Sequence, residues 1–268
     1  MSATVKTTTL IAAIVLTAAR LGAADGVLIV EKHTSSTGTA ETSQIQIEKT
    51  RMRAERGIGG RPQVIVFDSD AQVIRMIDPE RKTYREMTKA DVDRIGSQMS
   101  GAMAQMQEQM KNLPPEQRER MEALMRGRGL AGAAAVKTEY RRNGTDKVGK
   151  WTCDKYDGYK KDEKVSEICT VAPATLGLTL ADFDITKQAA QFFQQLAPQT
   201  GEQQMFSIGG ADQGFSGIPV RSVVTVGQRQ ITTEVTEVTR KTFPSDSYAV
   251  PAGFQKQELP TGRRGRQD

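Results

Sequence analysis

The 268-residue chain is 37% hydrophobic, 26% charged and only 5% aromatic, and its length suits one large domain or two small ones. Its 37 basic and 32 acidic residues give a formal net charge of +5, and most of this excess is spread along the chain. Nucleic-acid-binding proteins usually concentrate basic residues in one patch, so the charge distribution argues against that class.

Residues 1–24 have the pattern of a secretory signal peptide. Lys6 is basic, residues 10–19 form an apolar run, and Gly22 and Ala24 are small residues before a cleavage site. The apolar run is too short to span a membrane, which needs about 20 residues. We therefore expect a soluble, periplasmic protein.

Residues 26–87 contain strand-like stretches that are separated by short turns. The stretch QIQI places Ile45 and Ile47 on one face, and QVIVFD, QVIRMID and KTYREM follow with only short polar connections. Short loops between successive strands imply antiparallel pairing. This region therefore predicts an antiparallel meander.

At Thr88 the pattern changes from strand to helix. Thr88 and Asp91 form a Thr-x-x-Asp capping box, and the helix is expected to run to about Lys111. A Pro-Pro pair then ends it and starts a second helix over residues 116–126. The sequence therefore predicts a helical insertion, residues 88–128, that folds back as a hairpin.

Strand patterns resume after the insertion and continue to the end of the chain. Asn143-Gly144 is a strong signal for a two-residue hairpin turn. A second capping box at Thr179 is expected to open a helix that runs to about Leu196. The predicted apolar side of this helix carries Leu180, Phe183, Phe192, Phe193 and Leu196. A further hairpin and a short strand follow, and residues 259–268 are expected to form a disordered basic tail.

The only two cysteines are Cys153 and Cys169. Export would place them in an oxidising compartment. The polar stretch KKDEK predicts a hairpin turn centred near Lys161, which would put Cys153 directly opposite Cys169. We therefore expect a cross-strand disulfide, for which the chain-entropy account suggests about 3 kcal/mol of stabilisation.

No group of residues has the pattern of a catalytic or metal site. The single histidine, His33, falls in the first predicted strand, where a surface or packing role is expected. Zinc sites need clusters of cysteine and histidine, and acyl-transfer enzymes need a nucleophile, a base and an orienting group. We therefore expect no enzymatic activity, no cofactor and no metal.

The helical insertion carries six of the eleven methionines. They are Met99, Met103, Met106, Met110, Met121 and Met125. The first four are spaced by 4, 3 and 4 residues, which places them on one face of a helix. This face has three interpretations: core that packs on the sheet, an adaptable surface for apolar ligands or partners, or a copper(I) site made by thioethers.

Several stretches occur in a characteristic order along the chain. They are GVLIVEKH, VIVFDSDAQVIRMIDPERKTYREMTKAD, PPEQRERME, GKWTCDKYDGY, LGLTLADF, GIPVRSVV, TEVTEV and YAVPAGFQ. In this order they resemble an uncharacterised bacterial exported family that is grouped with the LolA/LolB-like periplasmic lipoprotein carriers.

The resemblance implies an α+β fold in which a strongly curved antiparallel sheet, a half-open barrel, holds helices on its concave side. In the carriers that face is apolar and receives acyl chains. The carriers lack the methionine-rich insertion, so lipoprotein transfer is not implied directly.

Pattern and resemblance together predict one β-rich domain, residues 25–258, that binds an apolar ligand such as a lipid or an acylated partner between sheet and helices. The expected ligand contacts are Met99, Met103, Met106, Met110, Met121, Met125, Phe183, Phe192 and Phe193. The alternative is a chaperone-like envelope protein that binds other proteins through an exposed methionine face. A continuous apolar cavity would favour the ligand, and a filled concave face with outward methionines would favour the partner.

Overall fold

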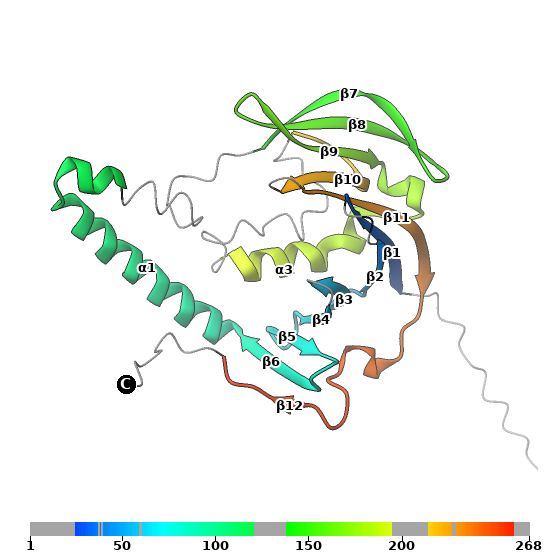
Figure 1. Cartoon of the computed structure of the whole chain (residues 1–268). Coiled ribbons are helices and arrows are strands. Elements are labelled where there is room, and N and C mark those ends of the chain that lie inside the picture. Colours follow the sequence, from blue (N-terminus) through cyan, green and yellow to red (C-terminus); the bar gives the residue numbers. More distant parts are fainter. Residues whose placement is uncertain are drawn as a thin grey trace, which may run out of the picture.

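The computed structural model describes residues 25–36, 38, 40–58, 61–120, 138–194, 214–226 and 229–259. Figure 1 shows one large, open, curved sheet with a short helix, α3 (Asp184–Gln194), inside its curve. A long helix, α1 (Lys89–Lys111), extends from one edge of the sheet. The α+β class and the curved, mostly antiparallel sheet that the sequence predicted are therefore confirmed.

Twelve strands in the described part of the chain join this sheet, in the order β12-β6-β5-β4-β3-β2-β1-β11-β10-β9-β8-β7. Their bounds are β1 Gly26–Ser35, β2 Ala40–Ile47, β3 Arg51–Ile58, β4 Arg61–Asp68, β5 Val73–Asp78, β6 Thr83–Thr88, β7 Glu139–Val148, β8 Trp151–Lys160, β9 Glu163–Val171, β10 Ile218–Val226, β11 Arg229–Lys241 and β12 Gln255–Lys256. The pair β12–β6 is parallel, and the others are antiparallel. Strands from both sides of the helical insertion thus share one sheet.

Four strand pairs contain a shift in register. These shifts lie in the pairs β1–β11, β9–β10, β7–β8 and β8–β9. A β-bulge bends its strand and increases the local twist. The bulges therefore contribute to the curvature that Figure 1 shows around β7–β11.

The main hydrophobic core lies where α3 meets the sheet. Val27, Ile47 and Phe67 on the strands pack in one cluster with Phe183 and Phe192 from the helical segment. The rings of Phe67 and Phe192 are 5.5 Å apart and meet edge to face. Side chains of α3 therefore pack against the concave face.

A second core covers the opposite face of the N-terminal strands. Val66 belongs to this cluster whereas its neighbour Phe67 belongs to the main core, as expected because alternate residues of a strand face opposite ways. The C-terminal segment supplies Phe243 and Tyr248, the latter from the 3₁₀ turn η6 (Ser245–Tyr248). The segment then adds β12 to the edge of β6.

The capping box that opens α1 is present as predicted. Thr88 Oγ1 accepts the backbone N–H of Asp91 at 3.2 Å, and Asp91 Oδ2 accepts the N–H of Thr88 at 3.1 Å. Val92 is fully buried in the main core. Beyond Val92, none of the described side chains of α1 is buried.

The expectation that the inserted helices lie on the concave side is wrong for α1. Figure 1 shows α1 continuing away from the sheet after its first turns, while α3 lies inside the curve. The apolar face of α1 beyond Ile95 consists of spaced methionines among small and polar residues. It buries less apolar surface than the Phe-bearing face of α3, which occupies the place predicted for both helices. Residues 115–120 are again helical, as the sequence predicted.

The prediction of a hairpin turn at Asn143-Gly144 is also wrong. Strand β7 continues through these residues as a bulge between Arg142 and Thr145, and the turn to β8 is made by Gly149-Lys150. Gly144 has a φ of 87°, which a bulge requires as readily as a turn does.

The second predicted helix starts at its capping box but begins with a tighter turn. Thr179 caps the 3₁₀ helix η2 (Leu180–Phe183), which follows η1 (Pro173–Leu176), and α3 starts at Asp184. The 3₁₀ turn changes the phase of the helix, so Leu180 is 61% exposed instead of facing the core. Leu196 lies outside the described residues.

Candidate functional site

The aromatic residues predicted to contact a ligand are mostly part of the main core. Phe183 and Phe192 are both buried, with Phe192 6% exposed, and they pack with Ile185 and Ala189 against the strands. The structure does not describe the side chain of Phe193. Two of the three predicted aromatic contacts thus pack in the core at the concave face.

A charged clamp holds the start of this helical segment to the sheet. Arg240 on β11 donates from Nη1 and Nη2 to the two carboxylate oxygens of Asp182, at 2.7 and 2.8 Å. The Thr179 N–H donates to the same carboxylate at 2.7 Å. Burial favours the neutral form of Asp182, but these hydrogen bonds outweigh it and lower its pKa. The clamp therefore fixes where α3 enters the concave face.

The predicted methionines lie on a helix that projects from the sheet. Met99, Met106 and Met110 are half-buried on α1. The structure does not describe the side chain of Met103, and Met121 and Met125 lie outside the described residues. The structure thus separates the methionines it describes from Phe183 and Phe192, which the sequence had assigned to the same ligand.

The stretch of α1 that carries Met99 and Met106 is uncharged. Residues 95–107 contain no Asp, Glu, Lys or Arg. At the end of α1, the Arg118 guanidinium donates to the carbonyl oxygens of Met110, Lys111 and Leu113 at 3.1–3.3 Å. These bonds satisfy carbonyls that a helix end leaves without partners, and they fix the reversal into residues 115–120.

Charged side chains line two of the pockets found among the described residues. The first, of about 500 Å³, lies where η2 and α3 meet the turns after β2 and β4. Five carboxylates and one amine are among its lining groups: Asp25, Glu48, Asp70, Asp182, Asp184 and Lys49. The second, of about 480 Å³, lies between β2, β3 and β4. The charged groups in both linings do not suit an acyl chain.

The predicted disulfide is confirmed. Cys153 and Cys169 are joined with their Cα atoms 5.4 Å apart, and both are buried in the main core. The expected register is wrong by two residues, because Cys169 pairs with Lys155. A bulge at Gly158 and a turn made by Lys161-Asp162 shift β9 along β8, so the disulfide runs diagonally.

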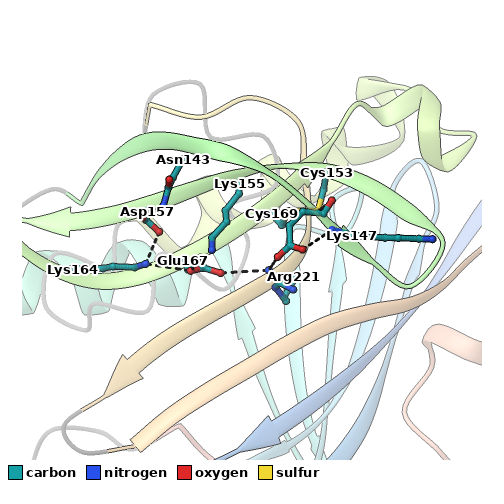
Figure 2. Close-up of polar contacts among 10 residues, drawn as sticks. Asn143, Lys147, Cys153, Lys155, Asp157, Lys164, Glu167, Cys169 and Arg221 are labelled. Carbon is teal, nitrogen blue, oxygen red and sulfur yellow. Dashed lines mark hydrogen bonds and ion pairs between the residues drawn. A yellow bond between two sulfur atoms is a disulfide. The ribbon is translucent and has the colours of Figure 1, made fainter.

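A charged network crosses strands β7, β8, β9 and β10 near the disulfide (Figure 2). Asp146 on β7 pairs in register with Cys153, and Arg221 on β10 pairs with Cys169. The Arg221 guanidinium forms an ion pair with Asp146, so it reaches past β8 and β9 at the level of the disulfide. It also approaches Glu167 at 3.4 Å.

The network continues toward the other end of β8. Glu167 accepts from Lys155 at 3.1 Å and from Lys164 at 3.2 Å. Lys164 also pairs with Asp157 at 2.6 Å, and Asn143 donates to Asp157 at 2.7 Å. Burial would raise the pKa of Asp157, but Lys164 and Asn143 lower it. The sequence did not identify this network, because its members come from four strands.

His33 forms a small polar cluster in the middle of the sheet. Its ring nitrogens lie 2.9 Å from Thr233 Oγ1 and 2.7 Å from Ser43 Oγ, so it links β1 to β11 and to β2. Burial lowers the pKa of His33, although the nearby Glu31 carboxylate opposes this. The predicted packing role fits this position.

Metal and membrane features were sought over the described part of the chain. No three residues among His, Cys, Asp and Glu come together there in a way that could hold a metal ion. None of its helices is long and apolar enough to span a membrane.

The family described as "Domain of unknown function (DUF4412)" matches residues 86–254, more than half of the chain. The chain belongs to the DUF4412 family. The match begins in β6 and ends just before β12, so it contains the helical insertion, the disulfide and α3. No curated protein matches this DUF4412 chain.

Three solved structures share a low similarity with the DUF4412 chain. An uncharacterized conserved protein from Thermus thermophilus is 7% identical over 87% of this chain and 90% of its own, with a TM-score of 0.42. PNGF-II is 9% identical over 87% of this chain and 31% of its own, with a TM-score of 0.36. A LolA superfamily protein from Nitrosomonas europaea is 6% identical over 84% and 90%, with a TM-score of 0.28. Likenesses at these scores carry no functional argument.

Proposed function

We propose that this chain is an exported, non-enzymatic protein that binds the apolar side chains of a partly unfolded protein partner through α1. The supporting observation is the position of α1, which projects from the sheet with Met99, Met106 and Met110 half-exposed. This geometry favours the protein-binding alternative over an internal apolar ligand.

The chemistry of α1 suits a partner with exposed apolar side chains. Met99, Met106 and Met110 share one face, and thioether side chains are flexible enough to fit different apolar groups. The uncharged stretch, residues 95–107, provides no opposite charge for an ionic partner. The partner's binding energy would come mainly from burial of apolar surface, at about 25 cal/mol per Å².

The packing of Phe183 and Phe192 on the concave face supports the same proposal. An acyl chain would have to displace Phe183 and Phe192 from the main core before it reached the strands. Burying each aromatic side chain is worth several kcal/mol, so this displacement opposes ligand entry.

The test compares two double variants of the full-length chain. Met99→Lys/Met106→Lys places charges on the methionine face, whereas Gln98→Lys/Gln105→Lys places equal charges on exposed polar positions of the same helix. The readout is the light scattering of thermally unfolding citrate synthase. We expect the wild type and the glutamine variant to suppress aggregation at equimolar ratio and the methionine variant to lose this effect. Equal suppression by both variants, or none by the wild type, would contradict the proposal.

An acyl chain in the concave face is the second candidate function. The observation that favours this candidate is that a single short helix, α3, covers the apolar strands. Only the start of its segment is held by the Arg240–Asp182 ion pair. If α3 swings out, a fluorescent fatty acid will bind and Phe192→Lys will abolish binding, while the α1 variants leave it unchanged. Native mass spectrometry without any co-purified amphiphile, together with no probe binding, would rule this candidate out.

A further inference from the structure

Strands β2 and β3 separate before they end. Their antiparallel pairing runs only from Ile47 and Met52 to Gln44 and Glu55. Beyond it, β2 continues to Ala40 paired with β1, and β3 continues to Ile58 paired with β4. The sheet therefore has an internal opening, between residues 40–43 and residues 56–58.

The pocket of about 480 Å³ lies at this opening. Its lining residues are Glu41, Thr42, Arg53, Glu55, Arg56, Arg61, Pro62, Gln63, Val64 and Pro79. They include both sides of the separation, since Glu41 and Thr42 belong to β2 and Arg56 belongs to β3. The volume is within the range of about 300–1,000 Å³ that is usual for ligand sites.

The charges of the pocket favour an anionic group. Glu55 is neutralised by Arg53, whose Nη2 and Nε donate to it at 2.7 and 3.1 Å. Arg56 and Arg61 have no ion pair within the described ranges, and Arg56 is half-buried. Glu41 is the one remaining acid in the lining. Two unpaired guanidinium groups against one carboxylate leave the pocket positive.

The backbone at the opening favours an extended peptide over a small anion. In an antiparallel ladder, alternate residues direct their N–H and C=O groups to opposite neighbours. Among the described residues, the stretch 56–58 has no strand neighbour on the side away from β4, and 40–43 has none away from β1. Strand edges of this kind are recognised by extended peptides that add as another strand.

We propose that the opening between β2 and β3 binds an extended peptide segment that pairs with the free edge of β3 and places a carboxylate at Arg56 and Arg61. The backbone pairing supplies affinity that does not depend on sequence, and the two guanidinium groups select an acidic or C-terminal residue. The site is separate from α1, so it does not rest on the function proposed above.

The test uses a synthetic probe, acetyl-Thr-Val-Thr-Val-Glu with a free C-terminal carboxylate, titrated into the full-length chain by calorimetry. We expect binding to the wild type, and Arg56→Gln to weaken it about tenfold because a hydrogen bond to a charged group is lost. Arg81→Gln is the matched control, because Arg81 is an exposed arginine that does not line the pocket. This control and Met99→Lys/Met106→Lys should bind the probe as the wild type does.

A second probe tests the backbone pairing without any change to the protein. The same peptide with every backbone amide N-methylated keeps its carboxylates but can no longer donate backbone hydrogen bonds to a strand edge, and we expect it not to bind. Equal binding of the methylated peptide, or full competition by millimolar inorganic phosphate, would show a small-anion pocket and overturn the proposal. No binding of the unmodified peptide at millimolar concentration would also overturn it.

Discussion

The two segments that begin with a Thr-x-x-Asp box have different surroundings. Thr88 and Asp91 start α1, and Thr179 and Asp182 start the η2–α3 segment. In each case the aspartate carboxylate accepts the backbone N–H and the hydroxyl of the threonine. Yet α1 leaves the sheet after Val92, whereas α3 supplies Phe192 to the main core. A capping box thus determines where a helical segment begins, and the apolar surface that follows determines whether it packs.

The largest expected difference between α3 and α1 is in their contribution to the stability of the fold. We expect Phe192→Ala to lower the free energy of unfolding by about 3–5 kcal/mol, because it removes a buried ring and leaves a cavity beside Phe67. Met106→Ala on α1 is the control and should cost less than about 1 kcal/mol, because Met106 is only half-buried. Urea unfolding followed by circular dichroism measures both, and equal losses would contradict the comparison.

Removal of the disulfide should affect the two helices unequally. Cys153 and Cys169 share the main core with Phe183 and Ile185, so Cys153→Ala/Cys169→Ala should cost about 2–4 kcal/mol and loosen the packing under α3. Amide hydrogen exchange should accelerate more in α3 than in the middle of α1. Uniform acceleration in both helices would show that α1 depends on the same core.

The two capping boxes should make similar contributions to the free energy of unfolding. Thr88→Ala and Thr179→Ala each remove a side-chain hydrogen bond to the aspartate at a helix start, and each should cost about 1 kcal/mol. Replacement by Ser, which keeps the hydroxyl, should restore most of this loss in both boxes. Urea unfolding measures the loss of unfolding free energy in each alanine variant. Losses that differ several-fold would show that the contribution of a capping box depends on how its helix packs.

The smallest expected effect is in the pH dependence of α1. A hydrogen bond from Arg94, with two from Thr88, lowers the pKa of Asp91 to about 2. A carboxyl with a pKa below its unfolded value stabilises the fold above that value, about 3.9, and this stabilisation is lost as pH falls through about 2. In an NMR titration, Arg94→Gln should raise the pKa of Asp91, while Arg118→Gln should leave it unchanged.

Local signals were sufficient for much of the fold. The turns after Asp68 and Asp78, both capping boxes and the pairing of Cys153 with Cys169 depend on residues that are close in sequence, and the structure contains all of them. The Asn143-Gly144 prediction failed because a bulge and a turn both accept glycine with positive φ. The choice between them depends on burial, since the turn at Gly149-Lys150 lets Val148 and Trp151 pair and enter the core.

The candidate sites depended on distant contacts and were harder to predict. The methionine spacing identified one helical face but not what it faces, because α3, more than 70 positions later, occupies the concave side. The Arg221–Asp146 pair joins residues 75 positions apart, and the β2–β3 opening depends on where two registers stop. Neither the ion pair nor the opening produces a periodic pattern in the sequence from which it could be predicted.

Because β1 lies between β2 and β11 in the sheet, one of its edges can pair earlier during synthesis than the other. Its pairing with β2 uses neighbouring residues, but its other edge pairs with β11, as in the contact between His33 and Thr233 across 200 positions. Strands β1–β6 can therefore assemble as soon as residue 88 has emerged, while the edge of β1 stays open until β11 is made. An open edge is a site of unwanted association, so the edge of β1 is exposed to such contacts until β11 has been made.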